Sequence, residues 1–164
     1  MRYLENNLSP APAATSHPRV IHELCAHARF SGASCARCRE VCPMGAIELA
    51  PTPRLNDSCV GCGGCVASCA TGALDAAPAS DAALSQALDP VWLRAGLAVF
   101  PCVRSGAPAG IHPLPCLGRV TETLLIEAFV LGGRKVILVA GECESCTLRL
   151  ATTPLESIVA FGRA

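Results

Sequence analysis

The hydrophobic and polar positions divide the chain into stretches of different character. Residues 1–19 carry three prolines among alanines and small polar residues without periodicity, so we expect a disordered or extended arm. Residues 20–78 have only short apolar stretches between closely spaced cysteines and glycines, and we expect them to form a first domain. Residues 79–96 are expected to form a helical connector, and residues 97–164 a second domain.

The second domain alternates between strand and helix patterns. Residues 97–100 are a short apolar run ended by Pro101, and residues 135–140 are an apolar run typical of a buried parallel strand. Between them lies a weak extended run at 111–115, which its prolines confine to the edge or end of a sheet. A helix follows it and can end at Gly132 and Gly133. Its inner face is predicted to consist of Val120, Leu124, Leu125, Ala128 and Leu131.

Capping residues predict three further helices. Ser80 can cap a short helix through Leu88, and Asp89 followed by Pro90 is a second cap with proline at the first helical position.

The third of these helices is the last in the chain. Thr153, Pro154 and Glu156 resemble a capping box that would start it. Its inner face is predicted to contain Leu155, Ile158 and Val159. Trp92 and Phe100 are most simply core residues, and residues 97–164 together predict a small α/β domain with a short parallel sheet.

Charge and composition narrow the possible partners. The formal net charge is zero, with thirteen charges of each sign, so a nucleic-acid partner is not expected. No apolar run approaches the roughly twenty residues that span a bilayer, and the N-terminus has no secretory signal pattern. We therefore expect a cytoplasmic protein without a membrane span.

Twelve cysteines suggest the chemistry, because a cytosolic protein more often uses them for metal binding or redox chemistry than for disulfides. Cys59, Cys62, Cys65 and Cys69 have intervening gaps of two, two and three residues, the spacing of the bacterial ferredoxin run. Glycines among them allow a tight loop whose amides can point toward cluster sulfides.

A second group repeats part of this pattern. Cys35, Cys38 and Cys42 are followed by Pro43, and Cys25 lies ten positions upstream of Cys35, so an insertion separates it from the group.

The two groups, CARCREVCPMGAI and CVGCGGCVASCATGAL, resemble two copies of one half of a bacterial-type dicluster ferredoxin, each with a Gly-Ala-apolar step. The resemblance covers residues 25–75 and implies an α+β ferredoxin-like fold with two 4Fe-4S clusters. It also implies crossed ligation, in which the last cysteine of each copy serves the other cluster. One cluster would then be held by Cys25, Cys35, Cys38 and Cys69, and the other by Cys42, Cys59, Cys62 and Cys65.

Other residues near the first group have alternative interpretations. Two CxxC pairs are also typical of zinc knuckles. A zinc site does not require three cysteines in a C-x2-C-x2-C pattern followed by a remote fourth ligand, however. His22 or His27 could replace a thiolate on iron. Positive charge or N–H donors near sulfide would raise a cluster's reduction potential. Three arginines near the first group could have this role, or could be ordinary solvated surface residues. They are Arg29, Arg37 and Arg39.

The last four cysteines form no local motif except CESC, but each follows a predicted element. Cys102, Cys116 and Cys143 each come after an apolar run, so parallel strands would bring their thiols to one carboxyl edge, where ligands of open α/β sheets gather. Cys116 also stands before a helix expected to open near Gly118 and Arg119, whose dipole would favour a thiolate. With Cys146, these cysteines could hold a third metal centre.

The segment PCLGRVTETLLIEAFVLGGRKVILVAGEC resembles the C-terminal region of the iron-sulfur delta subunits of methyl-viologen-reducing hydrogenases and heterodisulfide reductase assemblies. This resemblance implies a 2Fe-2S cluster on Cys102, Cys116, Cys143 and Cys146, and electron relay between larger subunits. Two interpretations of the residues stay open beside it: a redox dithiol at Cys143 and Cys146, or inert cysteines.

The sequence thus favours an electron-transfer subunit without catalytic residues of its own. Its expected partner is a redox protein of the hydrogenase, formate dehydrogenase or heterodisulfide-reductase type. An enzyme that reduces disulfides through Cys143 and Cys146 is the alternative, and an assembly or sensing factor is a third possibility. No nucleotide-binding or Ser-His-Asp pattern is found.

Overall fold

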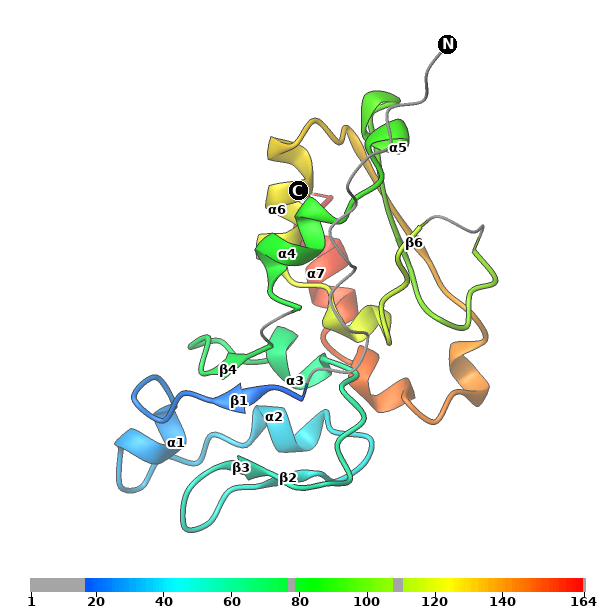
Figure 1. Ribbon diagram of the computed structural model, residues 1–164. Coiled ribbons are helices and arrows are strands. Elements are labelled where there is room, and N and C mark those ends of the chain that lie inside the picture. The colour runs from blue at the N-terminus through cyan, green and yellow to red at the C-terminus, as the bar shows by residue number, and fades with distance from the viewer. Residues whose placement is uncertain (1–16, 77–78, 108–110, 164) are drawn as a thin grey trace.

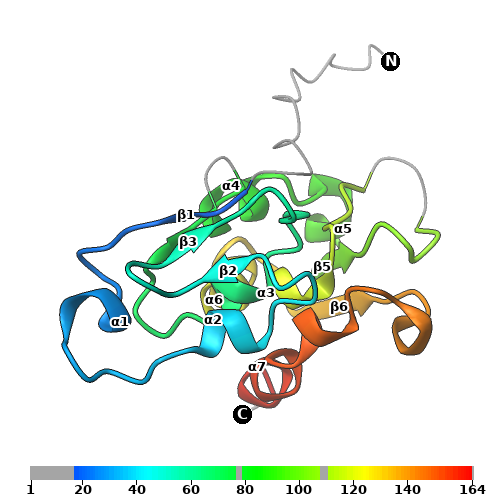
Figure 2. The same ribbon diagram turned by 90° about the horizontal axis from the view of Figure 1, so that it is seen from below.

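The computed structural model describes residues 17–76, 79–107 and 111–163, which form two parts lying side by side (Figure 1). We call residues 17–76 the first part and the described residues from 79 onward the second part. The view turned by 90° also places α1 at the end of the first part that is remote from β6 (Figure 2).

The first part contains short helices and two small antiparallel sheets. Its elements are β1 (Arg19–Val20), α1 (Ala26–Arg29), α2 (Arg37–Glu40), β2 (Ile47–Glu48), β3 (Arg54–Leu55), α3 (Gly64–Ala67) and β4 (Leu74–Asp75). Strand β1 pairs with β4, and β2 pairs with β3. Strand β1 begins within the segment expected to be an arm, whose residues 1–16 lie outside the described residues.

The repeated Gly-Ala-apolar step explains the position of two of these strands. Ala46 and Ile47 begin one strand region and Ala73 and Leu74 the other, and all four side chains are buried. The glycine before each step has positive φ, which residues with a side chain rarely adopt. The two halves therefore turn in the same way into the core.

The second part is built around a two-stranded parallel sheet. Its elements are α4 (Asp81–Gln86), α5 (Pro90–Arg94), β5 (Leu97–Pro101), η1 (Leu117–Arg119), α6 (Glu122–Val130), β6 (Lys135–Val139), η2 (Cys143–Ser145), η3 (Arg149–Thr152) and α7 (Leu155–Phe161), where η denotes a 3-10 helix. Strands β5 and β6 are parallel, with Leu97 opposite Lys135. Their order confirms the predicted strand, helix and strand.

The apolar side chains of the second part form one core beneath this sheet. Phe100 of β5, Leu124 of α6 and Ile158 of α7 are buried there, and Leu88 after α4 joins them. Burying a side chain of this size contributes about 1.5–3 kcal/mol, so this core is the main source of stability for the second part.

Two of the predicted helix caps are confirmed. The Ser80 hydroxyl accepts the Ala83 backbone N–H at 3.2 Å, and an Asp89 carboxylate oxygen accepts that of Val91 at 2.7 Å. Helix α4 ends at Gln86, slightly before the predicted end at Leu88.

The predicted capping box at Thr153 is wrong. Thr153 has helical backbone angles, whereas an N-cap residue needs an extended backbone, and its hydroxyl donates to the Leu150 carbonyl. Helix α7 instead begins at Leu155, directly after the turn of η3. Of the predicted inner face of α7, Ile158 is buried, and Leu155 and Val159 are half-buried.

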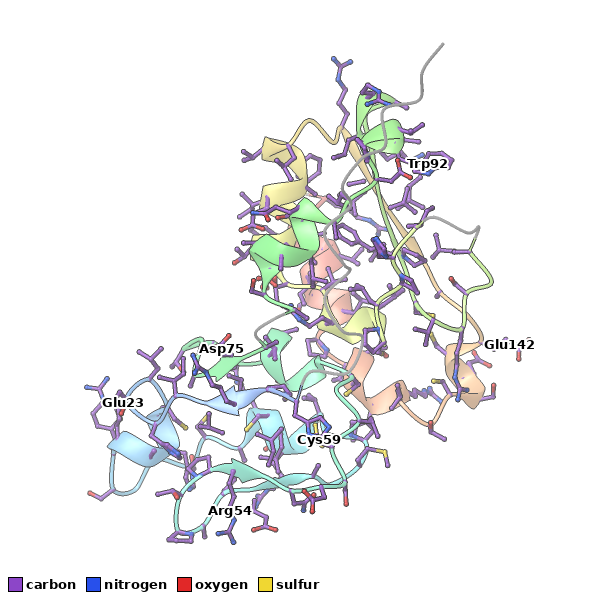
Figure 3. The ribbon with its side chains drawn as sticks, in the orientation of Figure 1. Glu23, Arg54, Cys59, Asp75, Trp92 and Glu142 are labelled. Carbon is purple, nitrogen blue, oxygen red and sulfur yellow. The ribbon has the colours of Figure 1, made fainter. Side chains whose placement is uncertain are left out.

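Three burial predictions also fail. Trp92 is 38% exposed and points outward from α5, a short helix without buried residues (Figure 3). Leu131 is 48% exposed because α6 ends before it. Strand β6 is only half-buried, since a two-stranded sheet leaves much of each strand accessible.

The weak run at 111–115 forms no regular strand. Only Leu114 pairs, in an isolated parallel bridge with Cys102. Pro113 and Pro115 lack the N–H groups that would extend the pairing. No helix in the described part of the chain is long and apolar enough to cross a membrane.

Candidate metal centres

Four cysteines from separate elements of the first part line one cavity of about 240 Å³, which we call site 1. Cys25 stands directly before α1, Cys38 lies in α2, and Cys69 follows α3. The four are Cys25, Cys35, Cys38 and Cys69. Burial raises the pKa of Cys38, and the neighbouring thiols of Cys69, Cys35 and Cys25 raise it further.

Some of the polar residues near site 1 line its cavity and others do not. The backbone of Arg39 opposes this increase in the pKa of Cys38, and Arg37 and His27 are among the residues that line the same cavity. The buried Nδ1 atom of His27 has no hydrogen-bond partner among the described residues. Arg29 instead lies over the ring of Phe30, with 5.2 Å between its guanidinium carbon and the ring centroid.

The other four cysteines of the first part line a second cavity, which we call site 2. The four are Cys42, Cys59, Cys62 and Cys65. Burial raises the pKa of Cys65 to about 12, and the thiols of Cys62, Cys59 and Cys42 add to this effect. Backbone N–H groups of Ala46 and Gly64 donate to the Cys42 and Cys62 sulfurs, the first at 3.3 Å.

Gly63 shapes the loop of site 2. Gly63 has φ +80° and caps α3, so a side chain there would strain the backbone. A Cβ at this position would also collide with Cδ of Arg119. The loop therefore packs against the second part of the chain as well as around its own cysteines.

Sites 1 and 2 exchange their last cysteines. Cys42 belongs to the first sequence group but lines site 2, and Cys69 belongs to the second group but lines site 1. This is the spatial grouping that the resemblance to dicluster ferredoxins implies.

The remaining four cysteines line a third cavity, which we call site 3. They are Cys102, Cys116, Cys143 and Cys146. Cys102 directly follows β5, and its backbone N–H donates to Val139 at the end of β6. Because β5 and β6 are parallel, their carboxyl ends bring Cys102 and Cys143 to one edge, as expected from the sequence, whereas the run before Cys116 forms only the isolated bridge of Leu114.

Backbone N–H groups donate to three of the four sulfurs of site 3. Gly141 donates to Cys102 at 3.3 Å, Gly118 to Cys116 at 3.4 Å, and Leu148 to Cys146 at 3.4 Å. Arg104 and Arg149 are also among the residues that line this cavity. N–H donors and positive charge of this kind stabilise thiolate sulfur.

The environment of Cys116 differs from the prediction. Its sulfur caps the three-residue turn η1, while α6 begins only at Glu122. Burial raises the pKa of Cys116 to about 11 and outweighs the bond from Gly118. So short a turn has little dipole to favour the thiolate.

All twelve cysteines lie among the described residues, and none forms a disulfide. No group of three or more His, Cys, Asp or Glu side chains in the described ranges is arranged to hold a single metal ion.

The comparisons with known proteins identify one region. Residues 33–74 match the family model of the 4Fe-4S dicluster domain. The match includes seven of the eight cysteines of sites 1 and 2 and begins after Cys25. It supports iron-sulfur binding and an electron-transfer role for this part of the chain. Neither the curated proteins nor the solved structures give a match to the chain.

A buried ion pair that was not predicted from the sequence lies beside the loop of site 2. Arg119 is 4% exposed, and its Nη1 lies 2.7 Å from Oδ1 of Asp81. Its Nη2 donates to the Ala79 carbonyl at 2.8 Å, and the Thr121 hydroxyl donates to the other oxygen of Asp81 at 2.6 Å. No local pattern links residues so far apart in sequence.

Proposed function

We propose that this chain is an electron relay in which sites 1 and 2 each hold one 4Fe-4S cluster. The observation that carries the proposal is that eight cysteines line two cavities, four to each, with their last members exchanged. A cubane takes four thiolate ligands, so each set is complete. When bound, such a cluster takes up and releases single electrons.

The ligand assignment follows from these cavities. Site 1 would use Cys25, Cys35, Cys38 and Cys69, and site 2 would use Cys42, Cys59, Cys62 and Cys65. Cys25 lies outside the matched region, and its support is its place in the site 1 cavity.

We further propose that site 3 holds a third iron-sulfur centre, of the 2Fe-2S type. Four thiols share one cavity, and backbone N–H groups donate to three of them. A redox dithiol at Cys143 and Cys146 would need only two of these thiols. The presence of Cys102 and Cys116 in the same cavity therefore favours metal binding.

The proposed partner is a redox protein of a hydrogenase, formate dehydrogenase or heterodisulfide-reductase type of complex. Support for this class comes from the resemblance of the second part to the delta subunits of such assemblies. The chain itself would contribute binding sites and a route for electrons, without a substrate of its own.

Iron and acid-labile sulfide in anaerobically purified protein test these proposals. We expect about ten irons per chain, and about eight after Cys143→Ser and Cys146→Ser together, with loss of a non-cubane EPR signal. A wild-type value near eight would remove the third centre, and a value near four would contradict two cubanes. Stoichiometric zinc in place of iron would contradict the whole assignment.

A further inference from the structure

Residues of sites 2 and 3 pack together at the contact between the first and second parts. Cys62 of site 2, Cys116 of site 3 and Ala151 of η3 form one buried cluster, and each is at most 8% exposed. The half-buried side chain of Leu148 packs against this cluster. The two cysteines thus belong to different proposed centres but share one apolar contact region.

Glycines bring the backbones of this region unusually close. A Cβ added to Gly64 of α3 would lie 2.7 Å from the Ala151 carbonyl oxygen, and one added to Gly118 of η1 would collide with the same oxygen. Neither glycine has positive φ, so close approach is what the absence of a side chain permits here. Helix α3, which carries Cys65 of site 2, and the turn η1, which Cys116 of site 3 caps, are therefore both pressed against one residue of η3.

A side chain also crosses between the two parts here. Arg119, three residues after Cys116, lies across Gly63, the residue that follows Cys62.

The three sites follow one another across the molecule. Cys25 of site 1 adjoins α1, which lies remote from β6 in both ribbon views (Figures 1 and 2). In the side-chain view, Cys59 of site 2 is drawn between Glu23, near α1, and Glu142, next to η2 (Figure 3). A chain of three centres would place site 2 in the middle.

We propose that the Cys62–Cys116 contact is the electron path between sites 2 and 3, held in place by Gly64 and Gly118 closing on Ala151. The inference rests on the proposed function. One electron would leave the centre held by Cys62, oxidising it, and enter the centre held by Cys116, reducing it. No bond is broken and no proton is needed, and the electron comes originally from a redox partner or a chemical reductant.

The substitution Gly64→Ala tests the path without changing a ligand. It inserts a methyl group between α3 and Ala151 of η3. Because Ala151 packs with both Cys62 and Cys116, this methyl group should separate the two cysteines. Gly133→Ala is the matched control, because its Cβ would meet a backbone oxygen, that of Ala128, at a similar 2.8 Å but between α6 and the sheet. Both variants keep all twelve cysteines.

EPR spectra and reduction kinetics give the readout. In the fully reduced wild type, we expect the site 3 signal to be broadened by the neighbouring reduced cubane. Gly64→Ala should reduce this broadening and slow the reduction of site 3 by electrons from site 2 severalfold, while Gly133→Ala should leave both unchanged. Equal broadening and rates in Gly64→Ala and wild type, with iron unchanged near ten, would overturn the path and leave the proposed function intact.

A second variant covers the case in which Gly64→Ala does not fold. Cys38→Ser should remove the site 1 cluster and leave sites 2 and 3, so the broadening of the site 3 signal should persist. Loss of the broadening in this variant would assign the interaction to site 1 and contradict the path. Absence of any site 3 signal in wild type, with about eight irons, would instead refute the third centre itself.

Discussion

At the scale of single residues, the cysteines are placed by burial as much as by spacing. Cys65 is 7% exposed and belongs to the core of the first part, packed with residues such as Ile47 and Leu74. Burial raises the pKa of its thiol to about 12, so the proton must leave when a metal binds. Cluster insertion and core formation are therefore coupled in this part of the chain.

Paired substitutions of the cysteines distinguish crossed from uncrossed ligation. Cys35 and Cys69 line one cavity, so the double variant Cys35→Ser/Cys69→Ser should lose a single cubane, about four irons. Cys35→Ser/Cys42→Ser should lose both, about eight irons, because these two residues line different cavities.

Iron content measured on both double variants checks this prediction. Uncrossed ligation would reverse the result, since Cys35 and Cys42 would then share a cluster. The comparison is matched because each variant removes two cysteines and keeps Cys35→Ser in common.

At the scale of secondary structure elements, caps connect helices that are distant in sequence. The Thr121 hydroxyl accepts the Leu124 backbone N–H at 3.0 Å and donates to Asp81 at 2.6 Å. One hydroxyl thus starts α6 and joins it to α4. Asp89, by contrast, caps α5 through a more exposed bond to Val91 alone.

We expect Thr121→Ala to destabilise the fold by about 2 kcal/mol, because the variant loses a cap and leaves a carboxylate oxygen without its donor. Asp89→Ala should cost about 1 kcal/mol. Anaerobic denaturant unfolding followed by circular dichroism measures both. Thr121→Ser keeps the hydroxyl and should recover most of the loss, and equal effects of Ala and Ser would contradict this role.

At the scale of the whole molecule, the ion pair of Arg119 and Asp81 holds the Arg119 side chain of the second part against Gly63 of the first part. Arg119 begins in the turn after Cys116, passes Gly63 of site 2 and ends at Asp81 of α4. Its side chain is 5% exposed and that of Asp81 is 21% exposed, so the two charges are poorly solvated and depend on each other.

Removing one partner should therefore be costly. We expect Arg119→Met to lower the free energy of unfolding by about 3 kcal/mol, because Asp81 is left without its counter-charge. Arg54→Met breaks an exposed pair with Glu48 and should cost no more than about 1 kcal/mol. Unfolding measured on both variants tests the difference, and similar small losses would show that the Arg119 pair is not a structural link.

The local features could be predicted from the sequence, because they depend on residues close together in the chain. The spacing around Cys59 and Cys62 indicated cluster ligands, and Ser80 and Asp89 marked helix starts through bonds within one turn. Strands β5 and β6 followed from apolar runs. Thr153 was wrongly predicted to cap the last helix, because a helix cap also requires an extended backbone and the preceding turn of η3 gives Thr153 helical backbone angles.

The contacts between groups distant in the sequence became known only from the folded structure. The gathering of Cys102, Cys116 and Cys143 was conditional on parallel strands, and the pairing between β5 and β6 meets this condition for Cys102 and Cys143. The burial of Arg119 against Asp81 and the closure of Gly64 and Gly118 on Ala151 had no signal in the sequence. These contacts arise when two cores pack together, and packing depends on the shape of whole surfaces rather than on local spacing.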